Sequence, residues 1–181
     1  MSQPAQGRVS YQERIRLPLW ILLLLGAVLG GTAGGMTGVA IAGALEGGEA
    51  AAFYLTFGLS ALIALFVLVN FASLSVTVSD AGIETAFGMF RKRLEWSQIK
   101  SVEPQPYRWA RYGGWGIRFG MSGGRAWSQL LVNTGVAMQI TEGGKERELY
   151  VSSRRPEELA AAVQSGIGVS PGVAAPPGTD P

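Results

Sequence analysis

The hydrophobic and polar positions divide the chain into an apolar first part and an alternating second part. No charged residue lies between Arg16 and Glu46, and none lies between Glu49 and Asp80. A helix needs about 20 residues to cross the hydrocarbon core of a bilayer, so each interval is long enough for one span. Core helices of a soluble protein are the alternative, but two such runs back to back favour a transmembrane helical hairpin.

The two transmembrane helices are predicted over residues 17–45 and 51–71, with a short external turn at residues 46–50. Basic residues flank the outer ends of the hairpin and not this turn: Arg8, Arg14 and Arg16 before it, and Arg91, Lys92 and Arg93 after it. Lys and Arg in short flanking segments favour the cytoplasmic side. We therefore expect a multi-pass protein of the plasma membrane with both termini in the cytoplasm. A cleaved signal peptide is the alternative, because the Ala-Gly-Ala at 42–44 resembles a cleavage site, but the apolar run is longer than the usual ~7–15 residues.

Small residues recur every four positions in both predicted helices. The first helix carries Gly26, Gly30, Gly34 and Gly38, and the second carries Ala52, Thr56, Ser60 and Ala64. Residues four apart share one helix face, and in lipid close backbone approach over small residues drives helix association. We interpret the two faces as the sides of one intramolecular seam. A groove for dimerisation or for a partner helix is the alternative.

After residue 72 the period changes to two. Leu74, Val76 and Val78 alternate with serine and threonine, which is the pattern of a half-buried strand. Further short strands are predicted near residues 83–87, 94–96, 99–102, 115–119, 126–133, 136–140 and 146–151. Pro156, acids in the next turn and Gly166 mark the start and end of a final helix.

These patterns divide the chain into segments. Residues 1–16 form a cytoplasmic N-terminal segment whose first ten residues are expected to be disordered. Residues 72–165 form one cytoplasmic domain of antiparallel strands closed by the helix. Residues 166–181, rich in glycine and proline, form a disordered tail.

The composition excludes several kinds of chemistry. The chain has no cysteine and no histidine, so it has no disulfide, no Cys/His zinc site, and no Ser-His or Cys-His pair. Gly-Met-Ser-Gly-Gly at 120–124 matches a nucleophile motif, but that motif needs a histidine base and a following helix. The acidic residues lack metal-ligand spacing. We therefore predict no catalytic, metal or cofactor residues, and a protein that is not an enzyme.

Basic and aromatic residues interleave between residues 107 and 127. One interpretation places the aromatic rings in the core and the arginines in water. The other is contact with anionic lipid at the membrane surface, with these candidate residues: Arg91, Lys92, Arg93, Arg108 and Arg111. Binding of single-stranded nucleic acid, which also uses this mixture, is not expected.

Two stretches resemble known proteins. VTVSDAGIETAFGMFRKRLEWSQIKSVEP and GVAMQITEGGKERELYVSSRRPEELAAAV resemble the opening and the end of bacterial pleckstrin-homology-like (PH-like) domains, which often follow two membrane helices. YQERIRLP and SSRRPEELAAAV also resemble a group of small two-helix membrane proteins from actinobacteria. The resemblance implies an antiparallel β-barrel or sandwich capped by a C-terminal helix. The basic motif of phosphoinositide-binding members is missing from the first hairpin, so that site is not carried over.

The expected fold class is therefore a membrane-anchored α+β protein: a transmembrane hairpin followed by a PH-like domain. We expect a non-enzymatic module that is tethered to the lipid bilayer and docks a protein partner or organises a membrane complex. The alternative function is recognition of anionic lipid headgroups by the basic and aromatic face. A homo-oligomer is compatible with both.

Overall fold

The computed structural model describes residues 8–43, 45, 47–120 and 123–169. Of the tail expected over residues 166–181, residues 166–169 belong to the last helix, which corrects that boundary. Residues 170–181 and residues 1–7 lie outside the described ranges. The described chain forms two compact units, one built on two long helices and one built mainly of strands. It is an α+β arrangement, as expected.

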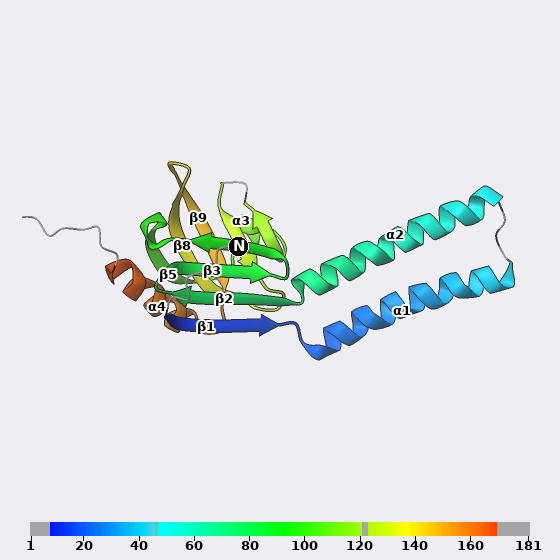
Figure 1. Cartoon of the computed structure of the whole chain (residues 1–181), viewed down its shortest axis with the longest axis horizontal. Helices are drawn as coiled ribbons and strands as arrows, with labels where there is room; N and C mark the ends of the chain where they lie inside the picture. Colours follow the sequence, from blue (N-terminus) through cyan, green and yellow to red (C-terminus); the bar gives the residue numbers. More distant parts are fainter. Residues whose placement is uncertain (1–7, 44, 46, 121–122, 170–181) are drawn as a thin grey trace, which may run out of the picture. The chain divides into compact units, whose positions relative to one another are not determined.

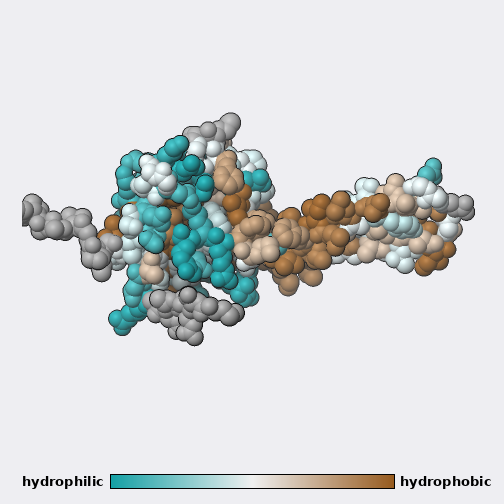
Figure 2. Space-filling view, turned by 45° about the horizontal axis from the view of Figure 1, so that its top comes forward, coloured by the Kyte–Doolittle hydropathy of each residue, from teal (hydrophilic) through white to brown (hydrophobic). Residues whose placement is uncertain are grey.

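The helical unit contains α1 (Leu19–Ala42) and α2 (Gly47–Phe71), which contact each other as an antiparallel pair (Figure 1). Both helices are long and apolar enough to cross a membrane. Their surface is mostly hydrophobic along the face seen in Figure 2. The prediction of two long apolar helices is confirmed.

The two small-residue faces predicted to form a seam do not meet in the structure. All eight residues of these faces are exposed: Gly26, Gly30, Gly34, Gly38, Ala52, Thr56, Ser60 and Ala64. A methyl group added at any of the four glycines would meet nothing within 4 Å. Half-buried side chains recur instead at spacings of three and four residues on another side of α1: Leu29, Thr32, Met36 and Val39. A methyl group at Gly58 of α2 would lie 3.9 Å from Cε of Met36, so the helices meet there.

Replacing Gly30 and Gly34 together by leucine should leave the stability of the hairpin within about 0.5 kcal/mol of the wild type, because both positions are open. Gly58→Leu should cost about 1–3 kcal/mol, because the larger side chain must displace Met36. Thermal unfolding in mild detergent compares the two variants. A larger loss in the double variant would support the seam predicted from the sequence. Loss of an oligomer alone would assign the glycines to contacts between copies.

The first sheet has the strand order β1-β2-β3-β4, and its strands are β1 (Val9–Arg16), β2 (Ser73–Ser79), β3 (Gly82–Phe87) and β4 (Phe90–Leu94). Strand β1 precedes the two long helices in the chain and pairs with β2, which follows them. The N–H of Asp80 donates to the carbonyl of Arg8 (3.2 Å), and the N–H of Leu17 donates to the carbonyl of Ala72 (2.9 Å). This pairing corrects the expectation of disorder for residues 9 and 10, since the strand begins at Val9.

The second sheet has the order β5-β8-β9-β7-β6. Its strands are β5 (Ile99–Pro106), β6 (Gly116–Phe119), β7 (Arg125–Ser128), β8 (Thr134–Glu142) and β9 (Lys145–Ser152). A short helix, α3 (Trp109–Tyr112), lies between β5 and β6. Strand β7 runs parallel to β9, and the other pairs in this sheet are antiparallel.

The described strands form two sheets and not one closed barrel, which corrects that part of the expected architecture. The break lies after β4, where residues Trp96–Gln98 form a 3₁₀ turn, η1. The backbone N–H of Glu95 donates to Oε1 of Gln98 (3.0 Å) as part of a capping box. The short strand predicted near 94–96 lies instead at Phe90–Leu94, because the chain leaves the sheet at this turn.

The core of the β unit follows the alternation of the sequence. Leu74, Val76 and Val78 are fully buried on β2, as predicted. Helix α4 (Pro156–Val169) contacts β5 and β8. The helix continues past the predicted end at Gly166 to Val169. A methyl group at Gly166 would overlap the ring of Trp96. Gly166 therefore allows close packing instead of ending the helix.

Candidate functional site

Three of the basic residues predicted to contact lipid, Arg91, Lys92 and Arg93, lie on β4. Nη1 of Arg91 lies 3.7 Å from Oε1 of Glu84, and Nη2 of Arg93 lies 2.5 Å from Oε2 of the same carboxyl group. Nζ of Lys92 lies 3.0 Å from Oε1 of Glu142. The hydrogen bond from Lys92 holds the pKa of Glu142 below its ordinary value. Arg91 and Arg93 thus share one acidic residue.

The other two predicted contacts, Arg108 and Arg111, lie at α3. Nη2 of Arg111 lies 3.1 Å from Oε2 of Glu148 on β9. Arg108 is exposed at the start of the helix, and no ion pair of its side chain is found within the described ranges. The five predicted residues are therefore divided among different acidic partners, and they do not form a continuous unpaired basic face.

Two exposed tryptophans mark the α3–β6 segment. Trp109 is 55% exposed and Trp115 is 39% exposed. Their ring centroids are 5.6 Å apart and their planes meet at 82°. We call these two residues the tryptophan pair. Phe119, at the end of β6, is also exposed, and the guanidinium carbon of Arg125 lies 5.3 Å from its ring centroid. The aromatic residues of this segment are therefore only partly core residues.

Three tyrosines, of which Tyr150 lies on β9, hold the α3 segment against the second sheet. The rings of Tyr107, Tyr112 and Tyr150 have centroids 5.1–5.7 Å apart. The hydroxyl of Tyr107 donates to the carbonyl of Gly114 (2.7 Å), and the hydroxyl of Tyr112 bonds to Glu148. Burial is the main cause that raises the pKa of Tyr112 and of Tyr150 above the ordinary value. These hydroxyls therefore stay neutral near physiological pH, and the tryptophan pair projects from a fixed support.

A buried polar cluster joins β1 to the start of α4. Oε2 of Glu13 accepts hydrogen bonds from the hydroxyls of Tyr11 (2.7 Å) and Ser153 (2.6 Å). Its Oε1 accepts from the backbone N–H of Arg154 (3.0 Å). The guanidinium carbon of Arg155 lies 5.0 Å from the ring centroid of Tyr11. Burial, more than any other cause, raises the pKa of Tyr11 to about 12. We call Tyr11, Glu13 and Ser153 the Glu13 clamp.

The clamp is a structural contact, because its three side chains are buried and its donors and acceptors bind one another. It unites the two segments, YQERIRLP and SSRRPEELAAAV, that carry the resemblance to the two-helix proteins. Sequence analysis missed it because a glutamate was not expected on an inward strand face. The available signal was the two-residue spacing of Tyr11 and Ile15, which places Glu13 on the same strand face and matches the burial pattern of β1.

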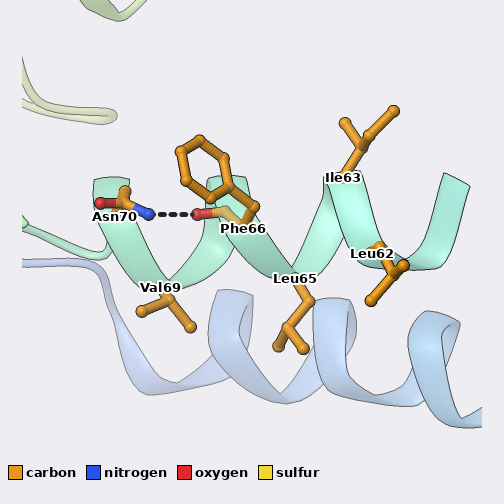
Figure 3. A pocket seen from close by; sticks show the side chains of 6 residues that line it. All are labelled: Leu62, Ile63, Leu65, Phe66, Val69 and Asn70. Carbon is orange, nitrogen blue, oxygen red and sulfur yellow. Dashed lines mark hydrogen bonds between the residues drawn. The ribbon is translucent and has the colours of Figure 1, made fainter. Parts of the chain in front are cut away.

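An open apolar hollow of about 520 Å³ lies along the second half of α2. Its lining consists of Leu62, Ile63, Leu65, Phe66, Val69 and Asn70. In Figure 3, Leu65 and Val69 point toward α1, whereas Ile63 and Phe66 point away from it. Asn70 is the only polar side chain in the lining, and its Nδ2 donates to the carbonyl of Phe66 (2.9 Å). The hollow therefore suits an apolar occupant.

The structure describes only part of the nucleophile-like motif at residues 120–124. Met121 and Ser122 of the nucleophile-like motif lie outside the described residues, and the segment that follows, Arg125–Ser128, is strand β7 and not a helix. Across the described ranges, no group of three or more Asp and Glu residues is placed to hold a metal ion.

Comparison with protein families gives a match. The model of a family described as "Protein of unknown function (DUF3093)" matches residues 10–163. The match extends from β1 through both long helices to α4, so it includes the Glu13 clamp and the tryptophan pair. No curated protein and no solved structure matches the chain.

Proposed function

We propose that this chain, which belongs to the DUF3093 family, is a non-enzymatic, membrane-tethered module that docks a protein partner. The helical unit provides the tether. The β unit provides the docking surface, which we assign to the tryptophan pair. Each part of this proposal has its own support.

The membrane tether is supported by the exposure of the two helices. Only 6% of the most apolar window of α1 and 0% of that of α2 are buried. A core helix of a soluble protein would be covered by its own chain, and large exposed apolar surfaces mark contact with a membrane or a partner. Helix α2 begins at Gly47, well beyond the usual position of a signal sequence. The basic residues outside the hairpin favour a plasma-membrane protein with both termini in the cytoplasm.

A PH-like fold for the β unit is supported by the order of its elements. Strands β1 to β4 form one sheet in sequence order, and β5, β8 and β9 are neighbours in the second sheet. Helix α4 follows β9 and contacts β5 and β8. In this proposal the two long helices are inserted after β1, and the α3–β6–β7 segment is inserted between β5 and β8.

The single observation that carries the docking proposal is the exposed tryptophan pair on its fixed tyrosine support. Tryptophan, tyrosine and arginine are the residues most enriched among those that dominate binding energy at protein interfaces. A side chain already held in place loses less entropy when it binds. Trp109 and Trp115 combine both properties, and the exposed Arg108 lies beside them in the chain.

The docking proposal predicts that Trp109→Ser with Trp115→Ser abolishes capture of the partner. The full chain is tagged, purified in mild detergent and analysed by quantitative mass spectrometry. Residues of this kind contribute about 2 kcal/mol or more, so recovery of a genuine partner should fall at least about tenfold. Val9→Ser, which removes an exposed apolar side chain from the other sheet, is the matched control and should retain it.

Equal recovery of the partner with the wild type, the double tryptophan variant and Val9→Ser would contradict the assignment of docking to the tryptophan pair. Recovery of a second, differently tagged copy of the chain would identify a homo-oligomer. A protein docked on aromatic side chains should be retained at high salt, whereas attraction to anionic lipid is screened.

Recognition of anionic lipid headgroups remains the second candidate, and one observation favours it. Arg91 and Arg93 share the single carboxyl group of Glu84, which leaves an excess positive charge on the exposed side of β4. In the chain, Arg91 and Arg93 come soon after the turn between β3 and β4, which contacts the end of α2.

A further inference from the structure

The turn between β3 and β4 packs against the C-terminal end of α2. The ring of Phe90 lies 6.4 Å from that of Phe66 and 5.8 Å from that of Phe71, between centroids. The ring of Phe87 lies 5.3 Å from that of Phe71. Residues Phe87–Phe90 accordingly belong to the helical unit and not to the β unit.

Asn70 joins the turn to the helix by hydrogen bonds in both directions. Its Oδ1 accepts from the backbone N–H of Met89 (3.2 Å), while its Nδ2 donates to the carbonyl of Phe66 (2.9 Å). Gly88 has φ +52, and a methyl group there would lie 2.7 Å from Oδ1 and 2.8 Å from Cα of Asn70. The turn is therefore held directly against the backbone of α2.

The apolar side chains of this turn are nevertheless exposed. Met89 is 68% exposed and Phe90 is 38% exposed. Phe66 and Phe71, which Phe90 contacts, are five residues apart, or about 7.5 Å along a helix axis. Helix α2 has 25 residues, which corresponds to about 37 Å and exceeds a hydrocarbon core of about 30 Å. If α2 spans the bilayer, its last turns and the β3–β4 turn lie in the interfacial region.

We propose that the β3–β4 turn is a membrane-inserted loop, which places Met89 and Phe90 in the bilayer interface beside α2. Arg91 follows Phe90 directly in the chain, so its guanidinium group meets the phosphate groups of the lipids. Nη1 of Arg91 lies 3.7 Å from Glu84, whose carboxyl group also pairs with Arg93. Arg91 can therefore exchange this carboxyl group for a lipid phosphate. This inference rests on the proposed function, in which α2 spans the membrane. It adds a contact between the β3–β4 turn and the lipid surface to the proposed contact between the tryptophan pair and a protein partner.

The test uses the absence of cysteine from the chain, which makes any introduced cysteine a unique labelling site. Met89→Cys, Leu62→Cys and Lys145→Cys each carry a fluorescent label in the full chain. The proteins are reconstituted in nanodiscs of phosphatidylcholine, with and without phosphatidylglycerol. Aqueous iodide and nitroxide-labelled lipids then report the surroundings of each label. Leu62 tests whether α2 lies in the bilayer, and Lys145, which is exposed at the start of β9, is the aqueous reference.

We expect the label at position 89 to be quenched several-fold less by iodide than the label at 145, and to be quenched most by nitroxide near the headgroups. The label at 62 should be quenched by nitroxide deep in the acyl chains. Adding Arg91→Gln should remove any increase in protection at 89 that phosphatidylglycerol produces.

Two different results would overturn the proposals separately. If position 89 is as accessible to iodide as position 145 while position 62 lies in the acyl chains, the inserted loop is wrong and the membrane tether stands. If position 62 is also open to iodide, the membrane-spanning role of α2 fails, and the inserted loop fails with it. An unchanged effect of phosphatidylglycerol in the Arg91→Gln variant would remove the role of this arginine.

Discussion

Glu13→Ala should lower the free energy of unfolding by roughly 3 to 5 kcal/mol, because it removes the acceptor that three donors share, two of them buried hydroxyls. The hydroxyls of Tyr11 and Ser153 and the N–H of Arg154 all point at the Glu13 carboxyl group. Water cannot replace that group easily, since Glu13 and Ser153 are 8% and 0% exposed. The full chain in mild detergent is unfolded by heat or denaturant, and circular dichroism follows the loss of the strands.

The neighbouring Gln12 provides the matched control. Its side chain is exposed on the opposite face of β1, so Gln12→Ala should change stability by no more than about 0.5 kcal/mol. Tyr11→Phe removes one donor and leaves the carboxyl group in place, so it should cost only about 1 kcal/mol. If Glu13→Ala is as stable as Gln12→Ala, the clamp does not hold β1 to α4.

Gly82→Ala should destabilise the protein by roughly 3 kcal/mol or more, because the position requires both an unusual backbone conformation and the absence of a side chain. Gly82 begins β3 with φ +133, a region that residues with a side chain rarely adopt. An added methyl group would also overlap the carbonyl oxygen of Leu94 on β4. The measurement is the yield of folded protein in detergent together with its unfolding midpoint.

Gly143→Ala separates these two causes. Gly143 lies in the β8–β9 turn with φ +59, and an added methyl group there would meet nothing within 4 Å. The backbone strain alone should cost about 1 kcal/mol. Equal losses at Gly82 and Gly143 would mean that the close approach of Leu94 contributes nothing.

The candidate site shows where residue types alone are insufficient. Arginines and aromatic residues interleave between residues 107 and 127. Their arrangement depends on partners from other strands: Arg111 pairs with Glu148 of β9, and Tyr107 and Tyr112 pack on Tyr150. Because those partners come from distant parts of the sequence, no local pattern distinguished the exposed tryptophan pair from the buried tyrosines.

The elements that depend on local periodicity could be predicted from the sequence alone. Two long apolar runs specify the two helices, and the alternation at Leu74, Val76 and Val78 specifies β2, because each signal lies within one element. The contacts between elements were established only by the tertiary structure. It paired β1 with β2 across the two long helices and joined Glu13 to Ser153, which are 140 residues apart. It also turned the glycine face of α1 away from α2. These outcomes depend on the packing of side chains from separate elements, and periodicity within one element does not encode that packing.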